Sequence, residues 1–199
     1  MGESGRAGAN PGFDGAVPTG GLDEQVARAL RGWNASTRIA EPPQDEPPLS
    51  DEMQRVRDWV ARRYRVSGEE LAPVLVEAEN SARSAGLDPL LIVAMMAVES
   101  SFNPLAESKM GARGLMQVIP RWHMDKIGEG AHEDVLFDPV VNVQVGTQVL
   151  VEGLQRYGSL QAALQYYNGA RSDPEARYTK KVLSIKRQLA SVARVEDDA

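Results

Sequence analysis

An unbroken apolar run over residues 90–98 ends at a single carboxylate, Glu99, and constrains the fold more than any other feature of the sequence. A helix that is apolar on every side must be buried on every side. The run is too short to cross a membrane, which takes roughly 18 to 20 apolar residues. Its length alone would also suit a buried strand, but Asp88 and Pro89 before it are typical of a helix start. The pattern therefore predicts the central helix of a globular core.

Two amphipathic patterns precede this run. Apolar residues at steps of three and four predict a helix over residues 53–64. Ser67 and Glu70 have the spacing of a capping box, so we expect a second helix to begin after Ser67. Gly86 predicts where that helix ends, because glycine readily adopts the left-handed conformation that closes many helices.

The C-terminal part of the chain carries three more helical patterns. Apolar spacing predicts a long helix over residues 141–157. Ser159 is placed to cap a short helix over residues 160–167. Asp173 and Pro174 together predict the start of a last helix, since aspartate caps and proline suits the first helical position.

The stretch between residues 103 and 138 lacks a sustained helical period. It is interrupted by glycine and proline, at Gly111, Gly114, Pro120, Gly128 and Gly130. Such residues favour turns and break regular elements. We expect a small β-hairpin or an irregular segment there, within a chain that is otherwise mainly α.

Glycine and proline also concentrate in residues 1–50, which hold 8 of the 18 glycines and 6 of the 12 prolines. Such a stretch buries too little apolar area to offset the entropy of ordering it. We therefore expect a flexible arm over residues 1–50 and a folded domain over residues 51–199. Within the arm, residues 22–33 have helical spacing and suit either a short marginal helix or a docking segment.

Composition excludes several classes of function. Lys and Arg number 22 against 28 Asp and Glu, and the net charge of −6 argues against nucleic-acid binding, which needs clustered basic charge. The chain has no cysteine, which rules out disulfides, thiol nucleophiles and Cys-ligated metals. No segment suits a membrane span, and the first 30 residues show no secretory signal. The spacing around His123 and His132 matches no metal motif, so neither a metal nor a cofactor is expected.

Glu99 is the strongest candidate for chemistry. If the helix continues, this carboxylate shares a face with Met95, Met96 and Phe102. Apolar surroundings disfavour the charged form of a carboxyl group, so we expect the pKa of Glu99 to be raised and the group to donate a proton near neutral pH. The alternative is that Glu99 ends the helix in water or pairs with a basic residue.

Three short motifs accompany Glu99 in a fixed order. They are Glu99-Ser100 with Phe102-Asn103-Pro104, then Gly114-Leu115-Met116-Gln117, then Tyr167-Asn168-Gly169. With these motifs the sequence resembles the catalytic domain of soluble lytic transglycosylases, lysozyme-like enzymes that cleave peptidoglycan. The resemblance covers about residues 65–190. One departure is Tyr166, since the family usually has a small residue before the motif tyrosine, and this leaves open which tyrosine faces the sugar.

The resemblance implies a mainly α, lysozyme-like (goose-type) domain with a glycan cleft and with Glu99 as the catalytic acid/base. It implies substrate contacts at Ser108, Met116, Gln117, Tyr167 and Asn168. Uncharged hydroxyl and amide side chains suit the hydroxyls and acetamides of a polysaccharide. We expect Gly111 and Gly114 to let the backbone approach the ligand closely.

A second catalytic carboxylate is not evident. Most glycosidases use two, although substrate-assisted enzymes are exceptions. The downstream acidic residues are Glu107, Asp125, Glu129, Glu133, Asp134 and Asp138. None of them has an apolar setting like that of Glu99, and Asp138 before Pro139 is expected to cap a helix. A single catalytic carboxylate is the simpler interpretation.

The resemblance therefore predicts a peptidoglycan lytic transglycosylase that cleaves the β-1,4 bond between N-acetylmuramic acid and N-acetylglucosamine and leaves a 1,6-anhydromuramoyl end. Two alternatives stay open: a hydrolytic muramidase, and a non-catalytic glycan-binding or assembly protein of a secretion apparatus. The expected partners are peptidoglycan strands, with an envelope or secretion-system partner bound through residues 1–50. The expected location is the periplasm or cell envelope.

Overall fold

The computed structural model describes residues 49–128 and 131–194. The predicted arm lies outside this part of the chain except for its last two residues, and so does the segment 22–33. The described residues form seven α-helices and one 3₁₀ helix, which confirms the mainly α class. In chain order the helices are α2 (Asp51–Tyr64), α3 (Gly68–Ser84), α4 (Pro89–Glu99), α5 (Pro120–Ile127), η1 (Glu133–Phe137), α6 (Pro139–Tyr157), α7 (Leu160–Tyr167) and α8 (Arg177–Ala193).

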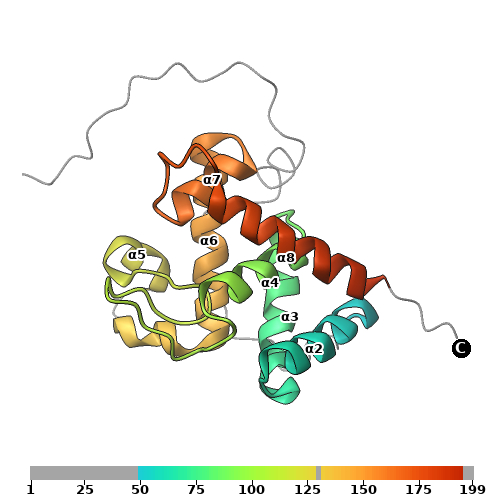
Figure 1. The fold of residues 1–199 in the computed structure, drawn as a ribbon. Coiled ribbons are helices and arrows are strands. Elements are labelled where there is room, and N and C mark those ends of the chain that lie inside the picture. Colours follow the sequence, from blue (N-terminus) through green and yellow to red (C-terminus); the bar gives the residue numbers. More distant parts are fainter. Residues whose placement is uncertain (1–48, 129–130, 195–199) are drawn as a thin grey trace, which may run out of the picture.

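Helix α4 is the central helix that the apolar run predicts. Residues 91–97 are each at most 6% exposed. The Asp88 carboxylate accepts a hydrogen bond from the backbone N–H of Leu90 at 2.9 Å and caps the helix. Helix α4 packs against α3 and α8, and Figure 1 shows it crossing the middle of the molecule. Helix α4 therefore runs through the core and ends at Glu99.

The helix ends at Glu99, so the expected face shared with Phe102 is wrong. Ser101 and Phe102 both have positive φ values, 53° and 66°, which turn the chain away from the helix. Phe102 is still buried, and its ring packs edge-on against Tyr64 with centroids 4.9 Å apart. The apolar side chain thus anchors the turn after α4 to α2.

Local capping signals locate most of the other helix ends. The Ser67 hydroxyl accepts from the Glu70 N–H at 3.3 Å, and α3 begins after it as predicted. At the other end Gly86 has a φ of 66°, and the N–H of Leu87 bonds to the carbonyl of Ala82 at 2.8 Å. This is the Schellman arrangement that a glycine after a helix favours.

Helices α6 and α7 agree with the prediction, but α8 begins later than Asp173 and Pro174 suggest. The Asp173 carboxylate accepts from the N–H groups of Glu175 and Arg177, both at 3.0 Å. Ala176 then has a φ of 48°, which keeps the chain out of the helix until Arg177. The aspartate therefore stabilises a separate turn, and the helix starts only after it.

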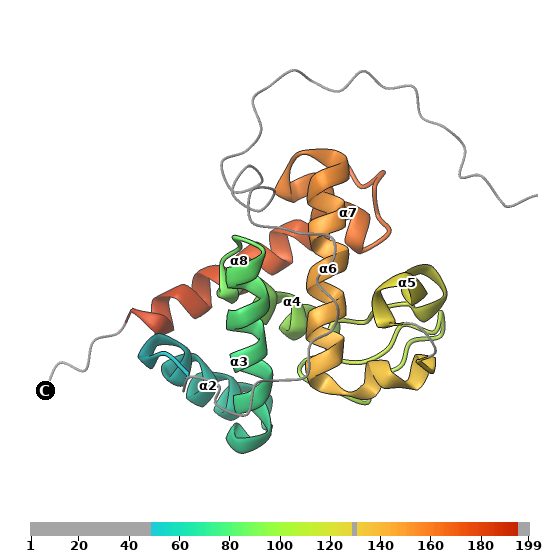
Figure 2. The same ribbon diagram turned by 180° about the vertical axis from the view of Figure 1, so that it is seen from behind.

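The region between α4 and α6 is irregular, with two isolated antiparallel bridges that join Arg113 to Glu107 and to Val118. It also contains α5 and η1, which the sequence did not predict. Helix α5 is short and departs from helical geometry at His123 (φ −136°, ψ 23°), so its apolar period is too brief to detect. Figures 1 and 2 show this region on one side of α6 and helices α2 and α3 on the other.

No helix within the described residues combines the length and the apolar character needed to cross a membrane.

Candidate active site

Glu99 lies half-buried at the C-terminal end of α4. The hydroxyl of Tyr178, from the first turn of α8, donates a hydrogen bond to its Oε1 atom at 2.6 Å. Burial raises the pKa of Glu99, and the Tyr178 hydrogen bond and the positive charge of Lys181 only partly oppose this effect. A carboxyl group in this setting retains its proton at higher pH than an exposed one.

Ser100, the residue after Glu99, ties the end of α4 to the loop that holds the second motif. Its hydroxyl donates to the carbonyl of Leu115 at 2.8 Å and lies 3.2 Å from the carbonyl of Met96. The Ser100 side chain therefore fixes the position of Glu99 relative to the Gly114–Gln117 segment.

A buried asparagine on α6 holds the other side of this loop. Asn142 is fully buried, and its Oδ1 atom accepts from the N–H of Met116 at 2.7 Å. Its Nδ2 atom donates to the carbonyls of Arg113 at 2.9 Å and Leu136 at 2.8 Å. One buried amide thus bonds to three backbone groups, of which the Arg113 carbonyl also accepts from the N–H of Val118 at 3.1 Å.

Gly114 allows this close packing, and the close approach of its backbone to a ligand stays a prediction. The residue is buried with a φ of 74°, and a β-carbon there would clash with the Asn142 side chain and the Leu136 carbonyl. Gly111 has a φ of 79° and faces open space, so only its backbone conformation calls for glycine.

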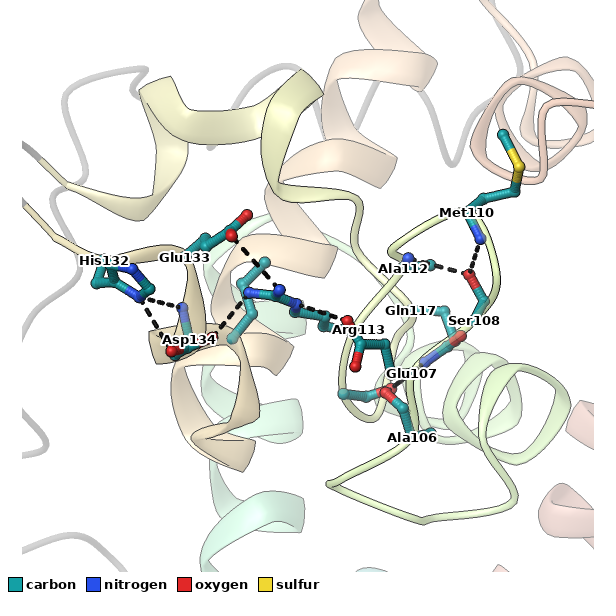
Figure 3. Close-up of polar contacts among 12 residues, drawn as sticks. Ala106, Glu107, Ser108, Met110, Ala112, Arg113, Gln117, His132, Glu133 and Asp134 are labelled. Carbon is teal, nitrogen blue, oxygen red and sulfur yellow. Dashed lines mark hydrogen bonds and ion pairs between the residues drawn. The ribbon is translucent and has the colours of Figure 1, made fainter.

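Ser108 and Gln117 fold the loop between α4 and α5, as Figure 3 shows. The Ser108 hydroxyl accepts from the N–H groups of Met110 at 3.2 Å and Ala112 at 3.0 Å. The Gln117 side chain donates to the carbonyls of Ala106 at 3.1 Å and Gly114 at 3.0 Å. These bonds occupy the Nε2 atom of Gln117 and leave its Oε1 atom able to accept from a ligand.

Arg113 clamps the same loop to η1. Its guanidinium lies 2.9 Å from Asp134 Oδ1, 3.3 Å from Glu107 Oε1 and 3.4 Å from Glu133 Oε1 (Figure 3). It also stacks over the Phe137 ring. Three of the carboxylates considered as second catalytic groups are therefore bound to one arginine.

Two further carboxylates of that set also have structural partners. Asp125 pairs with Lys126 at 2.8 Å, and Asp138 caps α6 by accepting from the N–H groups of Val140 and Val141. Glu129 lies outside the described residues.

An open cleft of about 800 Å³ lies between α5, α6 and α7. Gln117, Tyr167 and Asn168 line it, so the structure brings three of the predicted site residues together. Glu99 is not among the lining residues. Tyr167 lines the cleft and also interacts with Glu99. Burial and the negative charge of Glu99 both raise the pKa of Tyr167 well above its usual range.

The structure places Ser108 and Met116 away from the cleft lining. Met116 is fully buried and packs closely against Gly146 on α6, and its carbonyl accepts the Tyr167 hydroxyl at 2.8 Å. The direct contact of either residue with a glycan stays a prediction. In the structure Ser108 stabilises the loop between α4 and α5, and the Met116 carbonyl binds the hydroxyl of Tyr167.

Both tyrosines of the third motif line the cleft. The Tyr167 hydroxyl is bound to the loop, whereas the Tyr166 hydroxyl donates to Glu152 on α6 at 3.1 Å. The doubled tyrosine therefore supplies two aromatic surfaces to one cleft.

Tyr178 is the site residue that the sequence analysis missed. In the sequence it appears as one of the apolar positions of the last helix, and that is also its packing role, because it is 9% exposed. Only the fold brings its hydroxyl to Glu99, which lies 79 residues away in the chain.

A helical domain with a half-buried acid beside an aromatic, amide-lined cleft belongs to the lysozyme-like class of folds. Comparison with known proteins makes this more specific. The profile of the Transglycosylase SLT domain family matches residues 77–188, which is more than half of the chain, so the chain belongs to this family.

Individual relatives agree with this assignment. A transglycosylase of Enterobacteria phage PRD1 is 37% identical over 83 residues, which cover 42% of this chain and 29% of the relative. Membrane-bound lytic murein transglycosylase C of Actinobacillus succinogenes is 32% identical over 126 residues, which cover 56% of this chain and 34% of the relative. The match thus spans about a third of the length of these relatives.

A solved structure shows the same fold. The X-ray structure of an inactive Glu-to-Gln variant of the lytic transglycosylase Slt from Pseudomonas aeruginosa superposes with a TM-score of 0.50. The superposition has 25% sequence identity and covers 60% of this chain and 24% of that one. The lysozyme-like, mainly α fold expected from the motifs is therefore confirmed.

Proposed function

We propose that this domain is a peptidoglycan lytic transglycosylase that cleaves the β-1,4 bond between N-acetylmuramic acid and N-acetylglucosamine, with Glu99 as its single acid/base. The observation that carries the proposal is the half-buried carboxyl of Glu99, whose raised pKa suits a proton donor and whose neighbour Tyr167 lines the cleft. Family membership and the names of the relatives, which include lytic murein transglycosylases, support the same activity.

The reaction needs two proton transfers, both through the carboxyl group of Glu99. Protonated Glu99 donates to the glycosidic oxygen, the bond from that oxygen to C1 of the muramoyl residue breaks, and the N-acetylglucosamine end leaves as an alcohol. The acetamide of the substrate stabilises the positive charge at C1. The Glu99 carboxylate then takes the proton of the C6 hydroxyl as O6 bonds to C1, which restores the acid and consumes no water. General acid–base assistance of this kind contributes on the order of 10²–10⁴ in rate.

The surroundings of the other carboxylates favour a single acid. Glycosidases with two catalytic carboxylates hold them about 5–9.5 Å apart across the scissile bond. The described downstream candidates instead pair with Arg113 or Lys126 or cap α6. In the proposed mechanism the substrate acetamide takes the place of the second carboxylate.

The products of digestion test the proposed reaction. Purified sacculi treated with the full chain are expected to release muropeptides with 1,6-anhydromuramoyl ends, identified by mass because each lacks one water relative to a reducing end. Reducing ends in their place would establish the hydrolytic muramidase. If no muropeptide is released, the non-catalytic glycan-binding protein is the better account.

Tyr178→Phe tests how the acid is tuned. The hydrogen bond from Tyr178 favours the charged form of Glu99, so its removal raises the pKa of Glu99 further. Because the acid must be protonated to start the reaction, kcat/KM falls as pH rises through this pKa. We expect the alkaline limb of the pH profile to move about one unit higher in the variant, since a hydrogen bond to a charged group is worth about 1.5 kcal/mol or more.

The control for this prediction is Tyr64→Phe, which removes a hydroxyl from a half-buried ring on α2. Its pH profile should coincide with that of the parent. An alkaline limb that stays in place in Tyr178→Phe would show that the tyrosine only packs against the acid.

We also propose that the domain works in the periplasm or cell envelope, where murein lies, and that residues 1–50 form an arm that binds an envelope or secretion-system partner. Removal of residues 1–48 is then expected to leave the digestion of purified sacculi unchanged. A loss of that activity in the truncated chain would assign the arm to catalysis or folding.

A further inference from the structure

Two arginines outside the set of predicted site residues line the cleft. Arg156 comes from the last turn of α6, and Arg171 follows α7. The Arg156 side chain is 57% exposed, and its nearest carboxylate oxygen, on Glu152, is 3.9 Å away. Arg171 is exposed and donates to the Tyr157 hydroxyl at 3.2 Å, and no ion pair of Arg171 occurs within residues 49–128 and 131–194.

The acidic residue in the described cleft lining, Glu152, lies 3.9 Å from Arg156 but makes its shorter contacts with other residues. Its Oε2 atom lies 2.8 Å from the Lys126 ammonium, and its Oε1 atom accepts from Tyr166. Burial alone would raise the pKa of Glu152, but the hydrogen bond and charge of Lys126 outweigh it and hold that pKa below the usual range. Lys126 also pairs with Asp125 at 2.8 Å, so three cations, Lys126, Arg156 and Arg171, stand against two carboxylates. This end of the cleft therefore keeps a net positive charge in a chain whose net charge is −6.

The lining of the cleft also includes aromatic residues. Trp122 on α5 is 66% exposed, and Tyr166 on α7 lines the cleft with the Arg156 guanidinium 5.7 Å from the centre of its ring. Flat apolar rings suit the apolar faces of sugars, and guanidinium groups suit carboxylates, which they bind through two parallel hydrogen bonds. The combination fits a sugar with an anionic substituent better than a neutral polysaccharide.

We propose that Arg156 and Arg171 form an anion subsite that binds a carboxylate carried by the glycan strand. The subsite shares one cleft with Gln117, Tyr167 and Asn168, so a strand held by those residues extends to the arginines. The proposal rests on the proposed function. Murein offers this chemistry from two sources, the lactyl carboxylate of a peptide-free muramoyl residue and the carboxylates of an attached stem peptide.

The test uses the full chain and two cleavable substrates. One is peptide-bearing glycan strands, and the other is the same strands after an amidase has removed the peptides and freed the lactyl carboxylates. The variant is the double substitution Arg156→Gln and Arg171→Gln. The matched control is Arg62→Gln, which removes an exposed arginine from α2, on the far side of α6 from α5 (Figure 1).

The double variant is expected to raise KM about tenfold on at least one substrate with little change in kcat, because two charge-assisted contacts are lost in binding and none in the chemical step. An effect confined to peptide-bearing strands assigns the stem peptide as the source, and one confined to stripped strands assigns the lactyl group. Unchanged KM values on both substrates overturn the subsite.

Binding measurements separate this proposal from the proposed function. Calorimetry compares two soluble anionic ligands, a disaccharide-peptide and the same disaccharide with a free lactyl carboxylate, with a neutral chitin oligosaccharide. The subsite predicts that the double variant weakens binding of at least one anionic ligand about tenfold and leaves the neutral one unchanged, even if the parent chain cleaves nothing. Equal losses for the anionic and neutral ligands would show that the arginines support the shape of the cleft and bind no anion.

Discussion

Replacing Glu99 with glutamine is expected to slow the cleavage of peptidoglycan by a factor on the order of 10²–10⁴. Glutamine has nearly the same shape, and its carbonyl oxygen still accepts the hydrogen bond that Tyr178 donates in the parent at 2.6 Å. It carries no proton that it can give to a glycosidic oxygen. The rate of muropeptide release from purified sacculi, measured by chromatography at saturating enzyme, gives the factor directly.

A matched substitution controls for the loss of a negative charge. Glu69 is exposed in the first turn of α3, so Glu69→Gln makes the same chemical change away from the cleft. Its activity should equal that of the parent. If Glu99→Gln digests sacculi as fast as Glu69→Gln, then Glu99 is not the acid.

The stability of Glu99→Gln tests whether the expected loss of activity is catalytic or arises from misfolding. Because burial raises the pKa of Glu99, the folded state binds this proton more tightly than the unfolded state. The free energy of unfolding of the parent therefore falls as pH rises from the ordinary carboxyl pKa to the raised value. The variant lacks this decrease, so at pH 8 it should be at least as stable as the parent in urea.

Much of the helical framework could be predicted from sequence because its determinants are local. Asp88, Ser67 and Ser159 each accept a bond from an N–H group two or three residues ahead, so the motif and its structural effect lie in the same few residues. The burial of α4 follows from its apolar composition alone. Such signals do not depend on how the rest of the chain is folded.

The site itself depends on contacts that are distant in sequence. The bond between Tyr178 and Glu99 joins α8 to α4, and the sequence shows only an aromatic residue at an apolar position. The cleft arginines are similar, since α6 and the segment after α7 meet there only in the folded chain. The helix start predicted at Asp173 was wrong because a turn competed with the helix for the same carboxylate.

Asn142→Asp is expected to cause the largest loss of stability among single substitutions at the site. The parent side chain donates from Nδ2 to the carbonyls of Arg113 and Leu136, and aspartate places an acceptor there instead. The variant therefore buries a negative charge against two carbonyl oxygens, at a residue that is fully buried. Leaving a buried hydrogen-bonded group without its partner costs about 1–3 kcal/mol, and the Leu136 carbonyl loses its partner, whereas the Arg113 carbonyl keeps the N–H of Val118. A buried carboxylate without a cationic partner adds to this cost. We expect the free energy of unfolding to fall by about 3 kcal/mol or more.

Urea unfolding and thermal melting measure this effect. A loss of about 3 kcal/mol lowers Tm by roughly 6–12 °C in a chain of this size. The control is Gln161→Glu, the same amide-to-acid change at an exposed position on α7, where the expected change is within about 0.5 kcal/mol.

The pH dependence of Asn142→Asp identifies the cause of the loss. Burial against carbonyls raises the pKa of the introduced carboxyl in the folded state, so its folded form takes up a proton as pH falls. The protonated group has one O–H to donate, and the deficit relative to the parent should shrink toward pH 4 because the folded state then binds the extra proton. A deficit that is the same at pH 4 and pH 8 would mean that the variant fails by altered packing, and that the amide of Asn142 is not what holds Arg113 and Leu136 in place.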